Sequence, residues 1–150
     1  MKTLLKFFAV IILSLPFWGC ATSGPKYSEL LPALSTPPDT GRIYIYRTTV
    51  FGAAVQPEVK LNGEVVGKAI PKGFFYVDKK PGTYEILTST EVDRKLSLLL
   101  ECAQTRYVRL NMAMGFFVGH VYPELIDSET AEKEIQDCQY TGAELNVQNK

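Results

Sequence analysis

Few side chains in this sequence have the chemistry of catalysis. His120 is the only histidine, which excludes a histidine pair for acid–base or metal chemistry. Glu91 and Asp93 are two residues apart, so on a strand they would share one face as a carboxylate pair, the arrangement that glycosidases use. Charged residues beside a turn are usually solvated, and Arg94 and Lys95 stand close enough to neutralise them. The chain has no Gly-x-Ser-x-Gly elbow, phosphate-binding glycine loop or His-Glu-x-x-His helix, so we expect no catalytic residue.

A different chemistry, covalent lipidation, is indicated at Cys20. Lys2 and Lys6 form a basic start, residues 7–18 are almost all apolar, and Gly19 is a small residue directly before the cysteine. This order is typical of a signal peptide. The apolar run is far shorter than the roughly 20 residues that a membrane-spanning helix needs. We therefore expect the segment before Cys20 to be removed.

Three outcomes are open at the end of this segment. In the first, which resembles the bacterial lipobox, lipoprotein signal peptidase cleaves before Cys20 after a diacylglyceryl group is attached to its sulfur. In the second, ordinary signal peptidase cleaves after Ser23, with Ala21 and Ser23 as the small pair, and Cys20 is lost. In the third, the segment stays as an uncut anchor. We expect the first, and since Ala21 and not Asp follows the cysteine, the periplasmic face of the outer membrane is the predicted location.

Two further cysteines, Cys102 and Cys138, remain after Cys20 is assigned to the lipid. An even pair in an oxidising compartment favours a disulfide, so we predict a Cys102–Cys138 bridge. The alternative is two separate buried thiols, which pack as small apolar groups. Neither cysteine has a Cys or His partner at the short spacing of common zinc sites, so we expect no metal and no other cofactor.

The balance of charge argues against one class of partner. Lys2 and Lys6 leave with the signal, so the mature chain has 14 basic against 16 acidic side chains and no positive surplus for nucleic acid. Seven acids between Glu124 and Glu144 are accompanied by Lys133 alone. Such a run is typical of the exposed face of a helix, and the alternative is an acidic docking patch.

The mature chain is long enough for one domain with a modest core. Residues 20–40 collect Ser, Thr, Pro and Gly, and proline leaves such a segment extended, so we predict a flexible tether there. Within it, residues 27–34 could form a helical turn or pack locally, and the sequence decides neither. We therefore expect a signal peptide over residues 1–19, a lipidated tether over 20–40 and a single domain over 41–150.

From residue 41 onwards, apolar residues recur with a period of two, which is typical of half-buried strands. Asn62-Gly63 lies between two such runs and is a strong hairpin signal, because both positions of a type I′ turn need positive φ. On the strand from Leu96, alternation directs Cys102 toward the core. The predicted strands cover residues 43–46, 58–61, 65–66, 73–78, 84–88, 96–102, 107–112 and 116–122, the last ended by Pro123.

One helix is expected, over residues 128–137. Asp127 or Ser128 can cap it, and Ala131 and Ile135 lie one turn apart on a single face. Short strands with Gly and Pro turns, followed by this helix, predict a mainly β protein. The expected architecture is an antiparallel β-sandwich of about seven to eight strands with one C-terminal helix.

Four stretches of the chain, in this order, resemble a known bacterial family. They are GRIYIYR at 41–47, PEVKLNGEVVG at 57–67, GFFYV at 73–77 and PGTYEI at 81–86. The chain is similar to the domain of unknown function 2846, which occurs in small secreted lipoproteins and resembles PEGA-type β-sandwich modules in motif order. The resemblance implies a β-sandwich and brings no assigned catalytic residue.

Aromatic side chains on the strands provide a candidate binding surface. We expect Tyr44 and Tyr46, with Phe75 on the neighbouring strand, to form an exposed platform for a protein or glycan of the envelope. Packing in the core is the alternative for such rings. One histidine and no catalytic motif favour a non-enzymatic binding or structural module, attached to the membrane by its lipid. The alternative is an unrecognised envelope enzyme acting on glycan or peptide.

Overall fold

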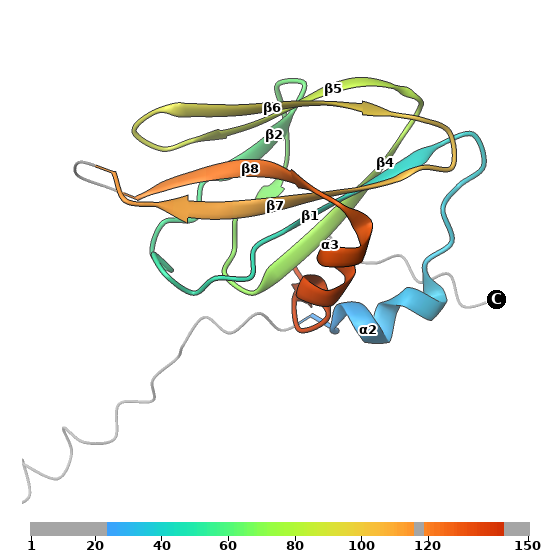
Figure 1. Cartoon of the computed structure of the whole chain (residues 1–150), viewed down its shortest axis with the longest axis horizontal. Coiled ribbons are helices and arrows are strands. Elements are labelled where there is room, and N and C mark those ends of the chain that lie inside the picture. Colours follow the sequence, from blue (N-terminus) through green and yellow to red (C-terminus); the bar gives the residue numbers. More distant parts are fainter. Residues whose placement is uncertain (1–23, 116–118, 143–150) are drawn as a thin grey trace, which may run out of the picture.

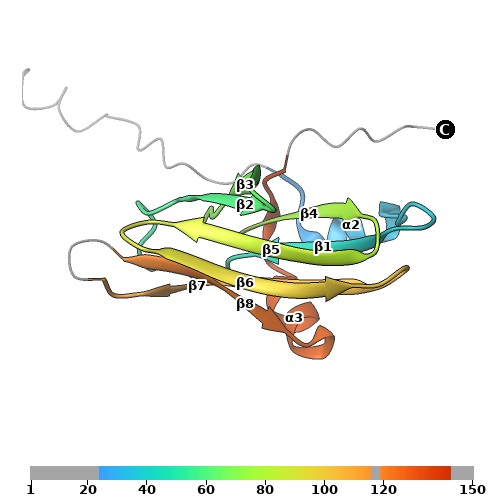
Figure 2. The ribbon, with the colours of Figure 1, turned by 90° about the horizontal axis from the view of Figure 1, so that it is seen from above.

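A computed structural model of the chain describes residues 24–115 and 119–142. Over these residues the protein is mainly β, with two sheets packed face to face and a short helix near the C-terminal end, so the predicted sandwich is confirmed (Figures 1 and 2). Cys20 and the signal segment lie outside the described residues. In the described part of the chain, no helix is both long and apolar enough to cross a membrane.

One sheet has the strand order β8-β7-β1-β4-β9, and the other has the order β3-β2-β5-β6. The strands are β1 (Gly41–Tyr46), β2 (Glu58–Leu61), β3 (Glu64–Lys68), β4 (Gly73–Lys79), β5 (Gly82–Ser89), β6 (Asp93–Leu100), β7 (Thr105–Ala113), β8 (His120–Ile126) and β9 (Gln139–Tyr140). The helices are α2 (Tyr27–Leu30), the 3-10 helix η2 (Leu31–Ala33) and α3 (Ser128–Ile135). Asn62 and Gly63 both have positive φ, as the predicted hairpin between β2 and β3 requires.

Two of the strand pairings are parallel, although the prediction was an antiparallel sandwich. β1 pairs with β7 and β4 with β9 in parallel, whereas the other five described pairings are antiparallel. Parallel neighbours need a crossover connection. The second sheet provides the crossover between β1 and β7. After β1 the chain forms β2 and β3 in the second sheet, returns to the first sheet for β4, and then forms β5 and β6 in the second sheet before β7.

The main core lies between the two sheets, and β1 contributes to it from the centre of its sheet. Ile43 and Ile45 point inward and have no exposed surface, as do Val59 and Ile86 from the opposite sheet. The other face of β1 is also buried, because α2 and α3 cover the outer surface of the five-stranded sheet (Figure 1). Every residue of β1 is therefore buried.

The packed domain begins earlier than the predicted boundary at residue 41. Tyr27 is 1% exposed and Leu30 is also buried, both in the cluster on the outer face of the five-stranded sheet. The Tyr27 amide donates a hydrogen bond to the Cys138 carbonyl oxygen over 3.0 Å. The segment from Tyr27 to Leu30 is therefore attached to the domain, because its apolar side chains cover rings that would otherwise face water.

The last long strand differs from its prediction at Pro123. β8 runs through Pro123 to Ile126, whereas we expected the strand to end before the proline. Proline lacks an N–H donor but is tolerated on an edge strand, and β8 is the edge of its sheet. Residues 116–118, the start of the predicted strand, lie outside the described residues. The helix is confirmed as α3, with the Asp127 side chain accepting a hydrogen bond from the Thr130 amide.

The predicted Cys102–Cys138 disulfide is absent, and the geometry of β1 explains why. Both thiols are free, Cys102 exposed and Cys138 buried. The turn that carries Cys102 bonds to the Thr40 carbonyl, before β1, while the Cys138 thiol lies against the Arg47 carbonyl, after it. Seven extended residues span about 23 Å, and a disulfide needs Cα atoms within about 7 Å. Cys102 is exposed because β6 ends at Leu100, two residues before the predicted end.

We expect the two thiols to react at very different rates. Burial raises the pKa of the Cys138 thiol to about 11, so little thiolate forms at neutral pH, and the side chain is 1% exposed. Alkylation of the native protein followed by peptide mapping should label Cys102 quickly and Cys138 only after unfolding. Recovery of a disulfide-linked peptide joining the two cysteines from unreduced protein would contradict this structure.

Candidate functional site

The outer face of the five-stranded sheet carries an unusual set of aromatic and charged side chains. They come from alternate positions of three adjacent strands, and α2 and α3 lie over them (Figure 1). The set includes Arg42, Tyr44, Tyr46, Phe74, Tyr76, Tyr107 and Arg109. Because successive residues of a strand alternate between faces, the inner face of the same strands remains apolar.

This arrangement corrects the predicted binding platform. Tyr44 is 4% exposed and Tyr46 is 1% exposed, because both lie beneath the helices. Phe75 is 3% exposed and belongs to the core between the sheets, where its ring lies against Gly67 so closely that a Cβ there would meet it at 2.6 Å. The three side chains therefore point to different faces and cannot form one surface.

What remains open on this face is a groove of about 390 Å³ between the sheet and the helices. Its walls come from α2 and η2 with the following residues, from α3, and from strands β1 and β7. The lining residues are Tyr27, Leu31, Leu34, Thr36, Arg42, Tyr44, Thr105, Tyr107, Glu132 and Gln136. Rings, hydroxyls, one cation and one carboxylate thus meet in a single concave site.

Three tyrosines that line this groove pack against one another. Tyr44 and Tyr107 stack with ring centroids 5.3 Å apart and an interplanar angle of 11°, and Tyr27 meets Tyr44 edge-on. The hydroxyls of Tyr27 and Tyr107 are 3.2 Å apart, and Tyr107 donates to Glu132 over 3.3 Å. Burial raises the pKa of both Tyr27 and Tyr107, so these hydroxyls stay protonated at neutral pH.

Arg42 gives the groove a fixed positive charge. Its guanidinium donates to both carboxylate oxygens of Asp78, at 2.6 and 2.8 Å, and to the Ser35 carbonyl at 2.9 Å. It also lies 4.2 Å from the centroid of the Tyr76 ring, a cation–π contact. Burial opposes the charge, but the hydrogen bonds to Asp78 and Tyr44 outweigh it and raise the pKa of Arg42. The bidentate geometry holds this cation in one orientation.

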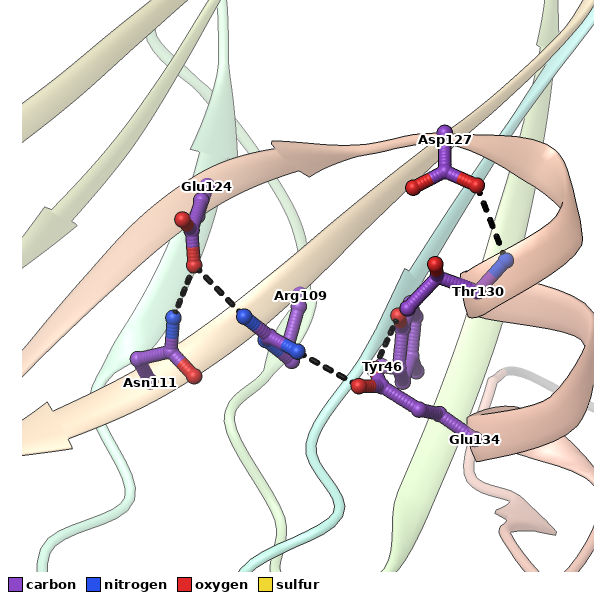
Figure 3. Close-up of polar contacts among 7 residues, drawn as sticks. All are labelled: Tyr46, Arg109, Asn111, Glu124, Asp127, Thr130 and Glu134. Carbon is purple, nitrogen blue, oxygen red and sulfur yellow. Dashed lines mark hydrogen bonds and ion pairs between the residues drawn. The ribbon is translucent and has the colours of Figure 1, made fainter.

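A polar network beside the groove holds α3 on the sheet (Figure 3). Arg109 on β7 donates to Glu134 of α3 at 2.5 Å and to Glu124 of β8 at 2.8 Å. The Tyr46 hydroxyl donates to the other oxygen of Glu134 at 2.7 Å, and the Asn111 amide donates to Glu124 at 2.5 Å. Since Arg109 joins the helix to two strands, it fixes the wall that presents Glu132 and Gln136 to the groove.

His120 lies elsewhere, at the start of β8, and has partners of its own. Its Nδ1 is 3.1 Å from the Thr90 hydroxyl, and its Nε2 is 3.6 Å from a carboxylate oxygen of Glu91. The structure thus brings two of the candidate residues together, while Asp93 is exposed at the start of β6. No group of three or more His, Cys, Asp or Glu side chains suited to a metal occurs within residues 24–115 and 119–142.

Several groove residues were not singled out by the sequence. Tyr107 was assigned only to a strand, and Arg42 lay just before the predicted strand 43–46, since alternation does not reveal that helices would cover one face. Glu132 and Glu134 were read as part of a solvated acidic run, but Glu134 is an ion-pair partner of Arg109 and Glu132 lines the groove. The spacing of Glu132 and Gln136, four residues apart on a helix, is the signal that they share a face.

Comparison with known proteins identifies a family and gives no function. The model of a family described as "Protein of unknown function (DUF2846)" matches residues 37–121. This chain belongs to the DUF2846 family. An "Uncharacterized protein" of Haemophilus influenzae is 29% identical over 94 residues, which is 62% of this chain and 56% of that protein. The chain thus spans about half the length of this relative. The DUF2846 match includes Arg42, Tyr44 and Tyr107 but neither α2 nor α3.

We expect Arg109→Met to loosen α3, because it leaves the Glu134 and Glu124 carboxylates without their shared cation. Arg109 and Glu134 are 24% and 28% exposed, so the loss in unfolding free energy should be about 1–2 kcal/mol, between exposed and buried pairs. Urea denaturation measures it. Lys133→Met is the matched control, since its pair with Glu129 is exposed and should contribute less than about 0.5 kcal/mol.

The same variant should change the acid sensitivity of the protein. The hydrogen bond from Arg109 lowers the pKa of Glu124 below its ordinary value of 4.5. The stabilisation of the folded state by this carboxylate is complete above pH 4.5, the ordinary pKa, and is lost as the pH falls through the lowered pKa of the folded state. The melting temperature of the native sequence should therefore fall more steeply below pH 4.5 than that of Arg109→Met. Parallel curves for the two proteins would contradict the role given to Arg109.

Proposed function

We propose that this protein is a lipid-anchored, non-enzymatic module of the bacterial cell envelope. Its groove between the five-stranded sheet, α2 and α3 would hold a polar chain, either a glycan or a peptide segment. The observation that carries the proposal is the meeting of Arg42, Glu132 and the stacked pair of Tyr44 and Tyr107 in one concave site. Concave sites with apolar walls and a few convergent polar groups are the usual places for ligands.

The chemistry of the groove suits a ligand rich in hydroxyl or amide groups. Glu132 supplies an acceptor, Gln136 supplies both a donor and an acceptor, and Arg42 supplies a positive charge that Asp78 holds in place. Leu31 at the rim is 43% exposed and offers an apolar contact beside these groups. Sugars and peptides both combine apolar faces with hydrogen-bonding edges, so either would use all these elements.

Binding without turnover is supported by the composition of the groove. Glu132 is the only carboxylate among its described lining residues, whereas glycoside hydrolysis usually needs a pair. The second candidate, an envelope enzyme, is favoured by a series of a hydroxyl, an imidazole and a carboxylate. The series is formed by Thr90, His120 and Glu91. None of the three lines the groove. Hydrolysis of a peptidoglycan fragment that His120→Ala abolishes would establish the enzyme instead.

The lipid anchor rests on the sequence around Cys20. Acyl chains such as palmitate stabilise membrane binding by about 0.8 kcal/mol for each buried CH₂, so two or three chains would anchor the domain firmly. We expect the intact mass of the purified protein to begin at Cys20 and to include the acyl groups. Cys20→Ser should leave the protein in the soluble fraction. A mature protein that begins at Gly24 and has no acyl group would contradict the anchor.

The groove is tested by titrating soluble peptidoglycan fragments, which contain both glycan and peptide, into the domain by calorimetry. We expect Glu132→Gln to weaken binding about tenfold, because a hydrogen bond to a charged acceptor contributes about 1.5–3 kcal/mol. Glu129→Gln on the same helix is the matched control, since Glu129 is 83% exposed and does not line the groove. Equal affinities for the two variants would contradict the assignment of the groove.

A further inference from the structure

The most exposed large apolar side chains gather at one end of the sandwich. Among the described residues, Met114 is 80% exposed, Val50 63% and Phe51 56%, and these are the highest values for such side chains. Val92, at the turn between β5 and β6, is 48% exposed. Figures 1 and 2 show the connections that carry these residues at the same end of the molecule. Exposed apolar surface beyond single scattered side chains usually marks an interaction site.

Strand pairings place these connections together. β1 and β7 run parallel, so the loop after Tyr46 and the hairpin after Ala113 leave the sheet in the same direction. The loop touches β7 directly. The Met112 side chain lies so close to Gly52 that a Cβ on Gly52 would overlap the Met112 Cε. The Thr88 hydroxyl donates to the Val121 carbonyl, which holds the β5–β6 turn beside the start of β8.

The loop that carries Val50 and Phe51 is held from within by Arg47. The Arg47 side chain is 1% exposed, and one of its terminal nitrogens donates to the Phe51 and Gly52 carbonyls, at 2.7 and 3.1 Å. The other donates to the carbonyls of Val55 and Ala69 at 2.7 and 2.8 Å. The backbone of the loop is therefore fixed to the core while the Val50 and Phe51 side chains face solvent.

The described chain begins at the flank of the five-stranded sheet beside β9, where Lys26 is level with Arg47 at the end of β1. Lys26 forms a bridge with Gln139, Gln139 pairs with Gly73, and the Gly73 carbonyl accepts a hydrogen bond from the Arg47 amide. Gly24 lies two residues before Lys26, against the Tyr140 carbonyl. Cys20 is four residues before Gly24, and an extended residue spans at most about 3.6 Å, so the two Cα atoms are at most about 14 Å apart.

We propose that the domain rests on the membrane with this end down and that the Val50–Phe51 loop enters the lipid interface. The inference depends on the proposed lipid at Cys20. Because residues 27–30 are packed on the domain, the link cannot extend over the 20 or so residues of a free tether. A lipid surface is the occupant that such a short link places beside the apolar end. Phe and Val at a membrane surface lose water contact at little cost in ordering, since the loop backbone is already fixed.

Tryptophan fluorescence tests the orientation. Trp18 is the only tryptophan of the chain and lies in the expected signal segment, so one substitution provides the only reporter in the mature protein. Phe51→Trp reports on the apolar end. Leu99→Trp is the matched control, since Leu99 is 52% exposed and lies near the opposite end of β6, beside the start of β1. Both proteins, purified with their lipid, are placed in phosphatidylethanolamine and phosphatidylglycerol vesicles that contain lipids with brominated acyl chains.

We expect brominated lipids to quench the Phe51→Trp protein at least about twofold and to leave the Leu99→Trp protein almost unchanged. Equal quenching of the two would overturn the orientation while the lipid anchor stood. Shielding of Phe51→Trp in native envelopes but no quenching in pure lipid vesicles would also overturn it, in favour of a protein partner. An unlipidated mass for the purified protein would instead overturn the anchor, and the inference with it.

Discussion

The structure depends on the burial of β1 from both sides. Apolar side chains from alternate positions of this strand enter the core between the sheets, while its tyrosines enter a second core beneath the helices. A buried arginine stands near each end: Arg42 is paired with Asp78, and Arg47 donates to four backbone carbonyls. Unpaired buried charges are costly, so these bonds determine where the neighbouring loops and helices can lie.

The two cores produce two candidate functional surfaces of different kinds. On the outer face, α2 and α3 bury the tyrosines of β1, and the space left between these helices and the sheet is the groove with its cation and carboxylate. At the end of β1, Arg47 closes a loop around its guanidinium and leaves Val50 and Phe51 outside. The same strand thus positions both the proposed site for a polar ligand and the apolar edge that we propose to contact lipid. A module held close to the membrane by a short link could use both at once.

Much of the fold could be predicted from local patterns, because the causes were local. Alternation located the strands, Asn62-Gly63 located a hairpin, and Asp127 located the cap of α3. The errors arose where long-range packing decides. Nothing near Tyr44 in the sequence shows that helices from both ends of the chain will cover it, so a buried ring was taken for an exposed platform. The pairing of Cys102 with Cys138 failed similarly, because their separation along β1 depends on the crossover between sheets.

The central claim is that α2 closes over the outer face of β1, since both the groove and the proposed short link to the membrane require it. Native-state hydrogen exchange on the full chain tests this at the Tyr27 amide, which donates to the Cys138 carbonyl over 3.0 Å. The account predicts that this amide exchanges at least about a hundredfold more slowly than an unstructured peptide, because it opens only when α2 detaches from the sheet. Exchange at the rate of a free tether would contradict it.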